Sequence, residues 1–326
     1  MSEPDRRPLC EAYDTAVLDL DGVVYIGERA VAGAAAALEG AVASGMHLAF
    51  VTNNASRSPE DVAAHLRELG VAAEPADVVT SAQAAAGLVA QQVPSGAEVY
   101  VIGGPGLETA LRERGLVPVT DLTGSPVAVV QGFGPQVPWR QVIDGAILVR
   151  EGLPWVASNT DLTVPTERGP GPGNGALVAL VAEFSGRTPL VAGKPRPPLF
   201  EETLARVGGT RPLVVGDRLD TDIDGAIAVG WDSLLVMTGV TTLADLARIE
   251  VSRRPTYVGA DLSRLAHPAT PVDGWTAAVV DGRLRVQGAG DVHGWWSAVA
   301  RTTWAHLDET GRPASTDGAV PGSVVA

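Results

Sequence analysis

The chain has 326 residues, a length beyond which one hydrophobic core rarely extends, so we expect two domains or one domain with a large insertion. Hydrophobic residues make up 45% of the sequence and charged residues 19%, and no stretch reaches the roughly 18 uninterrupted apolar residues of a membrane span. We therefore expect a soluble globular protein with no membrane partner. The formal net charge of −14 would repel a polyanion, which excludes nucleic acid as the main partner.

Two further features of the composition bear on compartment and chemistry. Cys10 is the only cysteine, so the chain cannot form an internal disulfide, and residues 1–9 are polar and charged where a signal peptide needs an apolar run. We expect a cytoplasmic protein. Among the 24 Lys and Arg residues, Lys194 is the only lysine. It is either a chance survivor or the sign of a site that needs a compact ammonium, which a planar guanidinium cannot replace.

The first seventy or so residues predict strand, helix, strand and helix in that order. Residues 15–20 and 47–52 are short apolar runs typical of buried strands. Residues 31–44 are rich in alanine and predict a helix, and residues 58–69 open with Ser-Pro-Glu-Asp, which is a helix N-terminus. Alternating strands and helices predict a parallel sheet with helices on both faces.

The same alternation returns late in the chain, where the sequence predicts strands at 189–192, 212–215 and 233–237 and helices at 197–207 and 220–229. Between the two stretches it predicts strands at 98–102, 127–131 and 155–157 and helices at 106–114 and 175–185. We therefore expect the late elements to complete the first sheet. The fold class is α/β: a Rossmann-like, doubly wound parallel sheet interrupted by an inserted α/β domain.

The C-terminal part has a different pattern. Residues 277–280 and 284–287 flank Asp281-Gly282 and predict a hairpin, and residues 292–307 predict an amphipathic helix. The predicted organisation is a core at 10–80 and 189–262, an insertion at 81–188, a small α+β extension at 263–310 and a flexible tail at 311–326.

Acidic residues follow two of the predicted strands, at the sheet edge where open α/β folds bind their ligands. Asp19 and Asp21 lie at the carboxyl end of the first strand. Their repulsion would be offset by a shared proton or by a hard cation such as Mg²⁺, although an Asp-Gly turn is the alternative. Asp217 follows the strand at 212–215, where helix capping explains Asp220 and Asp224 but not Asp217 itself.

Two further polar groups follow predicted strands. Thr52-Asn53-Asn54 could bind phosphate oxygens through a hydroxyl and backbone amides, or could be an ordinary polar turn. Lys194 follows the strand at 189–192. We expect all four groups to meet at one edge of a single sheet.

These groups resemble the four motifs of the haloacid dehalogenase-like superfamily of phosphatases, in the order Asp19-Leu20-Asp21-Gly22-Val23, Thr52-Asn53-Asn54, Gly193-Lys194-Pro195 and Gly216-Asp217-Arg218-Leu219-Asp220-Thr221-Asp222. The chain is most similar to the subfamily with a large α/β cap between the second and third motifs. That subfamily includes 4-nitrophenylphosphatase-like enzymes and phosphatases of pyridoxal phosphate, phosphoglycolate and glycerol phosphate. The resemblance covers residues 13–261 and leaves the C-terminal segment outside.

The resemblance implies a mechanism for the acidic residues. Asp19 would be the nucleophile that forms an aspartyl-phosphate, and Asp21 would protonate the leaving group and then activate water. Mg²⁺ would be bound by Asp19, by the backbone carbonyl of Asp21 and by Asp217, and Asp222 would order the water around the metal.

The resemblance also implies how the substrate is bound. Thr52, Asn53 and Asn54 would bind the phosphoryl group, and Lys194 would offset negative charge on it and on the nucleophile. The insertion would act as a cap that supplies the pocket for the leaving group. Its loop at 159–165 has no aromatic residue to stack on a ring, which favours a small polyol phosphate, and glycerol 3-phosphate best, over pyridoxal phosphate, a nucleotide or a sugar phosphate.

Other functions fit the motifs less well. A dehalogenase on the same core would not need Asp21, and a binding protein without activity would not need Asp19, Asp21, Lys194 and Asp217 together. A receiver domain lacks an insertion of this size. The expected partner is a small phosphorylated metabolite, and a homodimer through the cap or the C-terminal extension is a further hypothesis.

Lys194→Arg tests the interpretation of the only lysine. If Lys194 contacts both the nucleophile and the phosphoryl group, the longer planar head cannot occupy the same point, and kcat should fall by about 10² to 10³ with little change in Tm. Steady-state kinetics and thermal melting measure the two effects. A rate within about twofold of wild type would remove Lys194 from the site.

Overall fold

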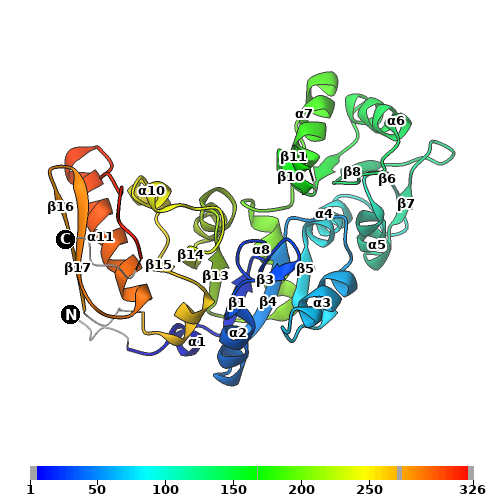
Figure 1. Cartoon of the computed structure of the whole chain (residues 1–326). Coiled ribbons are helices and arrows are strands. Elements are labelled where there is room, and N and C mark those ends of the chain that lie inside the picture. The colour runs from blue at the N-terminus through cyan, green and yellow to red at the C-terminus, as the bar shows by residue number, and fades with distance from the viewer. Residues whose placement is uncertain (1–5, 167, 270–273, 322–326) are drawn as a thin grey trace. The chain divides into compact units, whose positions relative to one another are not determined.

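The computed structural model describes residues 6–166, 168–269 and 274–321, and the chain divides into two compact units. The first unit comprises Met1–Phe50, Arg67–Ala72 and Gly209–Ala326, and the second comprises Val51–Leu66 and Ala73–Gly208. Each unit combines parallel strands with helices (Figure 1), which confirms the predicted α/β class. Among the described helices, none is both long and apolar enough to span a lipid bilayer. The last part of the predicted tail, residues 322–326, lies outside the described residues.

The first unit is built on parallel strands in the order β15-β14-β13-β1-β4. Their bounds are β1 Thr15–Leu18, β4 His47–Thr52, whose last two residues belong to the second unit, β13 Pro212–Gly216, β14 Asp232–Val236 and β15 Tyr257–Gly259. The helices of this unit are α1 Leu9–Ala12, α2 Ala34–Ala43, α9 Asp224–Val229 and α10 Leu243–Leu246. All four residues of β1 are buried, as expected for a central parallel strand that is covered on both faces.

Local backbone geometry moves two of the predicted helix starts. The helix predicted at 31–44 begins at Ala34, because Gly33 has φ of 78°, outside the helical region. The segment before it forms a short hairpin of β2 Tyr25–Ile26 and β3 Arg29–Ala30, which sequence reasoning missed. The helix predicted at 220–229 starts with a π-helical turn at Leu219–Ile223 and continues as α9.

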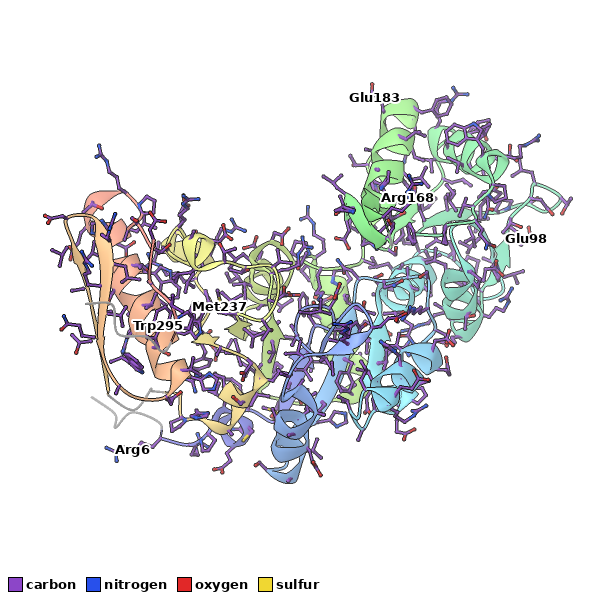
Figure 2. The ribbon with its side chains drawn as sticks, in the orientation of Figure 1. Arg6, Glu98, Arg168, Glu183, Met237 and Trp295 are labelled. Atoms are coloured by element: carbon purple, nitrogen blue, oxygen red, sulfur yellow. The ribbon has the colours of Figure 1, made fainter. Side chains whose placement is uncertain are left out.

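The C-terminal extension shares a hydrophobic core with the sheet of the first unit. It consists of β16 Trp275–Val280 and β17 Arg283–Gly288, which pair as the predicted hairpin, and helix α11 Val292–Thr310. The helix lies beside β15 and β16 (Figure 1). Its Trp295, which is labelled in Figure 2, and Val299 are both fully buried, and they belong to one cluster with Leu235 of β14 and Val258 of β15. The extension is therefore part of the first unit and not an appended tail.

The second unit has its own parallel sheet in the order β12-β9-β8-β6-β7. The strands are β6 Glu98–Ile102, β7 Val117–Val119, β8 Ala128–Gln131, β9 Trp155–Ala157 and β12 Leu190–Val191, with β5 Val78–Thr80 and the hairpin β10 Thr163–Thr166 and β11 Gly169–Pro172 outside this sheet. Its helices are α3 Pro59–Glu68, which ends in the first unit, α4 Ser81–Ala90, α5 Pro105–Glu113, α6 Trp139–Arg150, α7 Asn174–Ser185 and α8 Pro197–Val207. The sequence did not predict helices α1, α4, α6 and α10 or strands β5, β7, β10, β11 and β15.

One strand assignment from the sequence is wrong. Strand β12 does not complete the first sheet: it pairs with β9 of the second sheet, with Leu190 opposite Val156 and Val191 opposite Ala157. Lys194, which follows β12, therefore follows a strand of a different sheet from Asp19. Two residues of strand are too short for their apolar pattern to specify a partner, so long-range pairing decides the sheet.

A buried histidine connects the extension to the end of β15. His293 of α11 is 3% exposed, and its Nδ1 accepts a hydrogen bond from the Ala260 backbone N–H at 3.1 Å. Nε2 then carries the proton and donates to Ser263 Oγ at 2.9 Å. Burial lowers the pKa of His293, and the neighbouring His267 and Arg264 lower it further, while Asp261 and Asp291 oppose the shift. The folded protein therefore keeps this imidazole neutral.

The neutral imidazole predicts a pH-dependent stability. Because the pKa of His293 is lower in the folded state than in the unfolded chain, the unfolded chain binds more protons as the pH falls through about 6.5, and the free energy of unfolding should decrease there. Urea unfolding at pH 7.5 and pH 5 measures this. The decrease should be smaller in His293→Gln, and an equal decrease in both proteins would assign it to other groups.

Candidate active site

Three carboxylates meet at the carboxyl ends of neighbouring strands in the first unit. Asp19 follows β1, Asp217 follows β13, and Asp222 lies in the π-helical turn after β13. Each offers a carboxylate oxygen, and these oxygens all lie within 4.8 Å of one another. The pairing of β1 with β13 sets this arrangement, since Leu18 lies opposite Val215 and the Asp19 N–H donates to the Val215 carbonyl at 2.9 Å.

Asp217 is held by the backbone and by small residues. It is fully buried, and the Val240 N–H donates to its Oδ2 at 2.6 Å. The Thr241 hydroxyl donates to its backbone carbonyl at 2.5 Å. Gly22 and Gly239 approach so closely that a Cβ on either would overlap the Asp217 carboxylate, with the Gly22 Cβ only 2.6 Å from Oδ2. The orientation of Asp217 therefore depends on two glycines.

The donor set fits a hard divalent cation. Asp217 and Asp222 are fully buried and Asp19 is half-buried. Three like charges at this separation repel one another in a low-dielectric site, and a cation would offset this repulsion. Oxygen-only ligands suit Mg²⁺ or Ca²⁺. These three residues could hold such a metal.

The other acidic residues of the two motifs lie outside this cluster. Asp21 is exposed and forms a β-bridge with Tyr25, and the Gly22 N–H donates to the Tyr25 carbonyl at 2.7 Å. Its carboxylate is therefore open to a proton donor or acceptor in solution. Asp220 pairs with Arg218 at 2.9 Å, and hydrogen bonding to this guanidinium lowers the pKa of Asp220. Asp224 pairs with Arg253 at 2.5 Å.

The second unit holds the remaining predicted residues. Thr52 Oγ1 accepts a hydrogen bond from the Asn54 N–H at 3.1 Å, and Asn54 Oδ1 accepts from the Ser56 N–H and hydroxyl at 2.8 and 2.7 Å. The Asn54 side chain thus closes the turn after β4. Asn53 and Lys194 are brought together, because the Lys194 N–H donates to Asn53 Oδ1 at 2.8 Å.

Sequence reasoning missed several polar residues around Asn53. Ser81, Asn159 and Asp161 all hydrogen-bond to it. The sequence carries one signal for two of them, because Asn159 and Asp161 come directly after a predicted strand.

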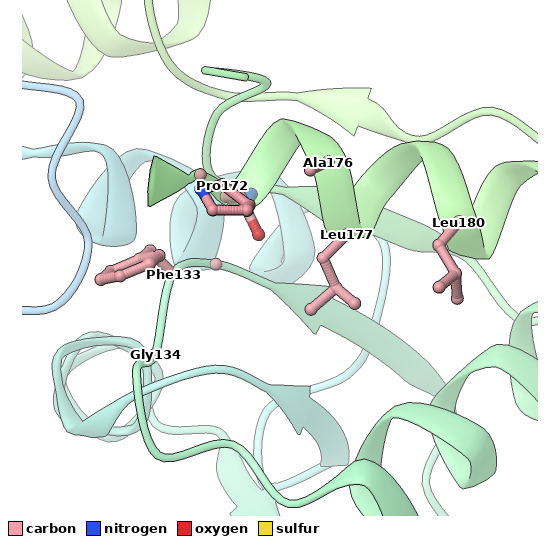
Figure 3. Close-up of a pocket in the computed structure, with 9 residues that line it drawn as sticks. Phe133, Gly134, Pro172, Ala176, Leu177 and Leu180 are labelled. Atoms are coloured by element: carbon pink, nitrogen blue, oxygen red, sulfur yellow. The ribbon is translucent and has the colours of Figure 1, made fainter. Parts of the chain in front are cut away.

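The second unit also contains a pocket of about 320 Å³ beside the N-terminus of α7. Figure 3 shows Phe133, Pro172, Leu177 and Leu180 among the residues that line it. Three glycines, Asn174 and Ala176 complete the lining. The pocket is largely apolar, and its polar groups are few.

Comparison with known proteins identifies the class. Residues 16–117 match a family model described as haloacid dehalogenase-like hydrolase, and residues 191–265 match a model described as HAD-hydrolase-like. The chain is 44% identical over 291 residues to D-glycerol 3-phosphate phosphatase of Mycobacterium tuberculosis, covering 88% of this chain and 82% of that protein. It is 39% identical over 253 residues to acid sugar phosphatase of Staphylococcus aureus, covering 77% of this chain and 96% of that protein.

Solved structures agree with these relatives. A crystal structure of glycerol phosphate phosphatase from Mycobacterium tuberculosis in complex with magnesium superposes with a TM-score of 0.85 at 43% identity, covering 94% of each chain. The 4-nitrophenylphosphatase of Thermotoga maritima has a TM-score of 0.73 at 30% identity and covers 79% of this chain and 98% of its own.

The chain therefore belongs to the haloacid dehalogenase-like hydrolase family, as the motifs predicted. Within that family it is a phosphatase, like the curated relatives that it matches. The second family model ends at residue 265, close to the predicted limit at residue 261, but the likeness to one relative extends further. The calcium complex of the Mycobacterium tuberculosis enzyme matches 97% of this chain, so most of the C-terminal extension must lie inside the match.

Gly239→Ala should weaken divalent cation binding, because the new Cβ would overlap the Asp217 carboxylate and displace it. We expect the apparent Kd for Mg²⁺, measured by calorimetry, to rise by about 10-fold or more, the range found when groups that orient a metal ligand are lost. Gly40→Ala is the matched control, since a Cβ there meets nothing within 4 Å. Unchanged Mg²⁺ affinity in Gly239→Ala would exclude Asp217 from the metal site.

Proposed function

We propose that this phosphatase uses Mg²⁺ and hydrolyses glycerol 3-phosphate through an aspartyl-phosphate on Asp19. The observation that carries the proposal is the cluster of Asp19, Asp217 and Asp222, with carboxylate oxygens within 4.8 Å of one another. The identity of 44% to a D-glycerol 3-phosphate phosphatase supports the substrate, and the magnesium complex of that family member supports the metal.

The reaction proceeds in two displacements. An Asp19 oxygen attacks phosphorus and forms an O–P bond while the bond to the ester oxygen breaks, and Asp21 gives its proton to the departing alkoxide. Asp21 then takes a proton from water as that water attacks phosphorus, and the bond to Asp19 breaks to release inorganic phosphate. When bound, Mg²⁺ offsets negative charge on the carboxylates and on the phosphoryl oxygens.

The remaining residues bind the phosphoryl group. The Thr52 hydroxyl and the backbone amide of Asn53 donate to the phosphoryl oxygens, and the Lys194 ammonium offsets the phosphoryl charge. The Asn54 side chain stabilises the turn after β4. Asp19, Asp217 and the backbone carbonyl of Asp21 would hold the metal, and Asp222 would act beside them by ordering water. The insertion at 81–188 acts as the cap that selects the leaving group. Residues 190–191, which the sequence assigned to the core at 10–80 and 189–262, pair instead with the sheet of the insertion.

The composition of the cap loop favours a small, flexible leaving group. Residues 159–165 carry no aromatic side chain, and Leu162 is 70% exposed. A polyol offers hydroxyls and little apolar area, so it does not require a stacking residue. A sugar phosphate is the second candidate, because acid sugar phosphatase is 39% identical to this chain.

We also propose that the protein is cytoplasmic and that it forms a homodimer. Sedimentation analysis would test the homodimer.

A panel of about twenty phosphate esters with Mg²⁺ tests the substrate. We expect glycerol 3-phosphate to give the highest kcat/KM, followed by sugar phosphates, with pyridoxal phosphate and nucleotides lower.

Asp19→Asn should abolish turnover of every ester with the fold intact, because an amide is a poor nucleophile and a poor metal ligand. Turnover near the wild-type rate in that variant, with its mass confirmed, would contradict the mechanism.

Asp21→Asn should separate the two steps in which a proton moves. An alkyl phosphate needs its leaving oxygen protonated, whereas 4-nitrophenolate leaves readily without a proton. We therefore expect the loss in kcat to be at least about 10-fold larger for glycerol 3-phosphate than for 4-nitrophenyl phosphate. Equal losses on the two substrates would show that Asp21 is not the acid.

A further inference from the structure

The side chain of Asn53 is bonded to the backbone of Lys194 in both directions. Asn53 Nδ2 donates to the Lys194 carbonyl at 3.1 Å, and the Lys194 N–H donates to Asn53 Oδ1 at 2.8 Å. The two residues are 141 positions apart in the sequence. Because both bonds engage one residue, they fix the direction as well as the position of the backbone from which the lysine side chain starts.

The surroundings of this contact leave little room for adjustment. Lys194 is 4% exposed. A Cβ at Gly193 would lie 2.5 Å from Asn53 Oδ1 and 2.6 Å from the Ser158 carbonyl oxygen, so only glycine lets the two segments approach this closely. Tight packing of this kind transmits a shift in one residue to the next.

Asn53 is in turn held by three neighbours. Its backbone carbonyl accepts hydrogen bonds from Ser81 Oγ at 2.6 Å and from Asn159 Nδ2 at 2.7 Å. Its Nδ2 also lies 3.2 and 3.3 Å from the two carboxylate oxygens of Asp161. A carboxamide is suited to this place, because it donates to the carboxylate and to a carbonyl while it accepts from an N–H.

The loop after β9 is itself anchored. Asn159 Oδ1 accepts from the Asp161 N–H at 3.1 Å, and the Asn159 carbonyl accepts from Asn174 Nδ2 at 2.7 Å. Asn159 and Asn174 are each 3% exposed. The network therefore runs from the first turn of α7 through the loop to Asn53 and ends at Lys194, entirely within the second unit.

We propose that the Asn53 side chain is the positioning group of Lys194, and that Asn159 and Asp161 hold Asn53 in place. The inference rests on the proposed function, in which the Lys194 ammonium offsets charge on the transferring phosphoryl group. It gives Asn53 a task beyond its backbone contact to phosphate, and it makes Asn159 and Asp161 positioning residues. The cap loop thus serves the phosphoryl site as well as the leaving group.

Asn53→Asp is the first test, because it has the same size and keeps the acceptor for the Lys194 N–H. It removes the donor to the Lys194 carbonyl and places a carboxylate against Asp161. We expect kcat to fall by about 100-fold, since a misplacement of about 1 Å has this effect. The loss should be equal for glycerol 3-phosphate and 4-nitrophenyl phosphate, because both carry the same phosphoryl group.

A residue swap provides a readout that general destabilisation does not give. Asp161→Asn alone keeps an acceptor for Asn53 Nδ2 and should lower kcat less than Asn53→Asp does. In the double variant Asn53→Asp with Asp161→Asn, the new amide donates to the new carboxylate at unchanged net charge. We expect this pair to recover at least about 10-fold of the lost kcat, so that the same Asp161 change lowers the rate in one background and raises it in the other.

Gln141→Glu is the matched control. Gln141 is a buried amide of the same unit whose Nε2 donates to the Val101 carbonyl at 2.5 Å, outside the Asn53 network. Any loss of stability in this variant should lower Tm without a comparable fall in kcat. The positioning of Lys194 by Asn53 is overturned if Asn53→Asp keeps kcat within about twofold or if Gln141→Glu loses as much. The role of Asp161 in holding Asn53 is overturned if the double variant shows no recovery.

Failure of the proposed function would be seen separately. If the wild type hydrolyses 4-nitrophenyl phosphate and not glycerol 3-phosphate, the substrate assignment fails and the variants are compared on 4-nitrophenyl phosphate. If the wild type hydrolyses no ester, calorimetry with inorganic phosphate and Mg²⁺ compares the wild type with Asn53→Asp. A Kd weaker by about 10-fold in the variant supports the positioning role, and an equal Kd overturns it.

Discussion

Repulsion among three carboxylates is the constraint on which the first unit depends. Asp19, Asp217 and Asp222 present oxygens within 4.8 Å of one another, and two of them are fully buried. Such a cluster is costly without a cation, so the surrounding structure must hold it rigidly. Parallel pairing of β1 with β13 places two strand ends side by side, and Gly22 and Gly239 leave room for the Asp217 carboxylate. Buried carboxylate oxygens that lie this close together are suited to binding a hard metal.

The second unit contains Lys194, whose backbone is fixed by side-chain hydrogen bonds. A lysine side chain has many rotamers, so its position is set mainly by where its backbone is fixed and by how tightly it is packed. Asn53 bonds both backbone groups of Lys194, and the loop after β9 bonds Asn53. The loop after β9 is therefore joined by hydrogen bonds to the turn that carries Asn53.

The extension shows how a segment outside the four motifs can still belong to the fold. Trp295 and Val299 are fully buried in the same cluster as Leu235 and Val258 of the sheet. The match to the phosphatase of Mycobacterium tuberculosis covers 97% of this chain, whereas the match to the 4-nitrophenylphosphatase of Thermotoga maritima covers 79% of this chain. Motif reasoning ended at residue 261 because a hydrophobic hairpin and helix carry no chemical signature, and only their burial against β15 shows where they belong.

The sequence by itself determined the α/β class, most strand positions and which polar residues stand at strand ends, because apolar periodicity and helix N-terminal signals act over a few neighbouring residues. It identified Asp19, Asp217 and Lys194 without showing how they are held. Only the tertiary structure decided that β12 pairs with β9 and that α2 begins after Gly33. It also decided that Asn53 hydrogen-bonds to the backbone of Lys194, 141 residues away. Such contacts depend on side-chain hydrogen bonds and packing between distant segments, which leave no periodic pattern in the chain.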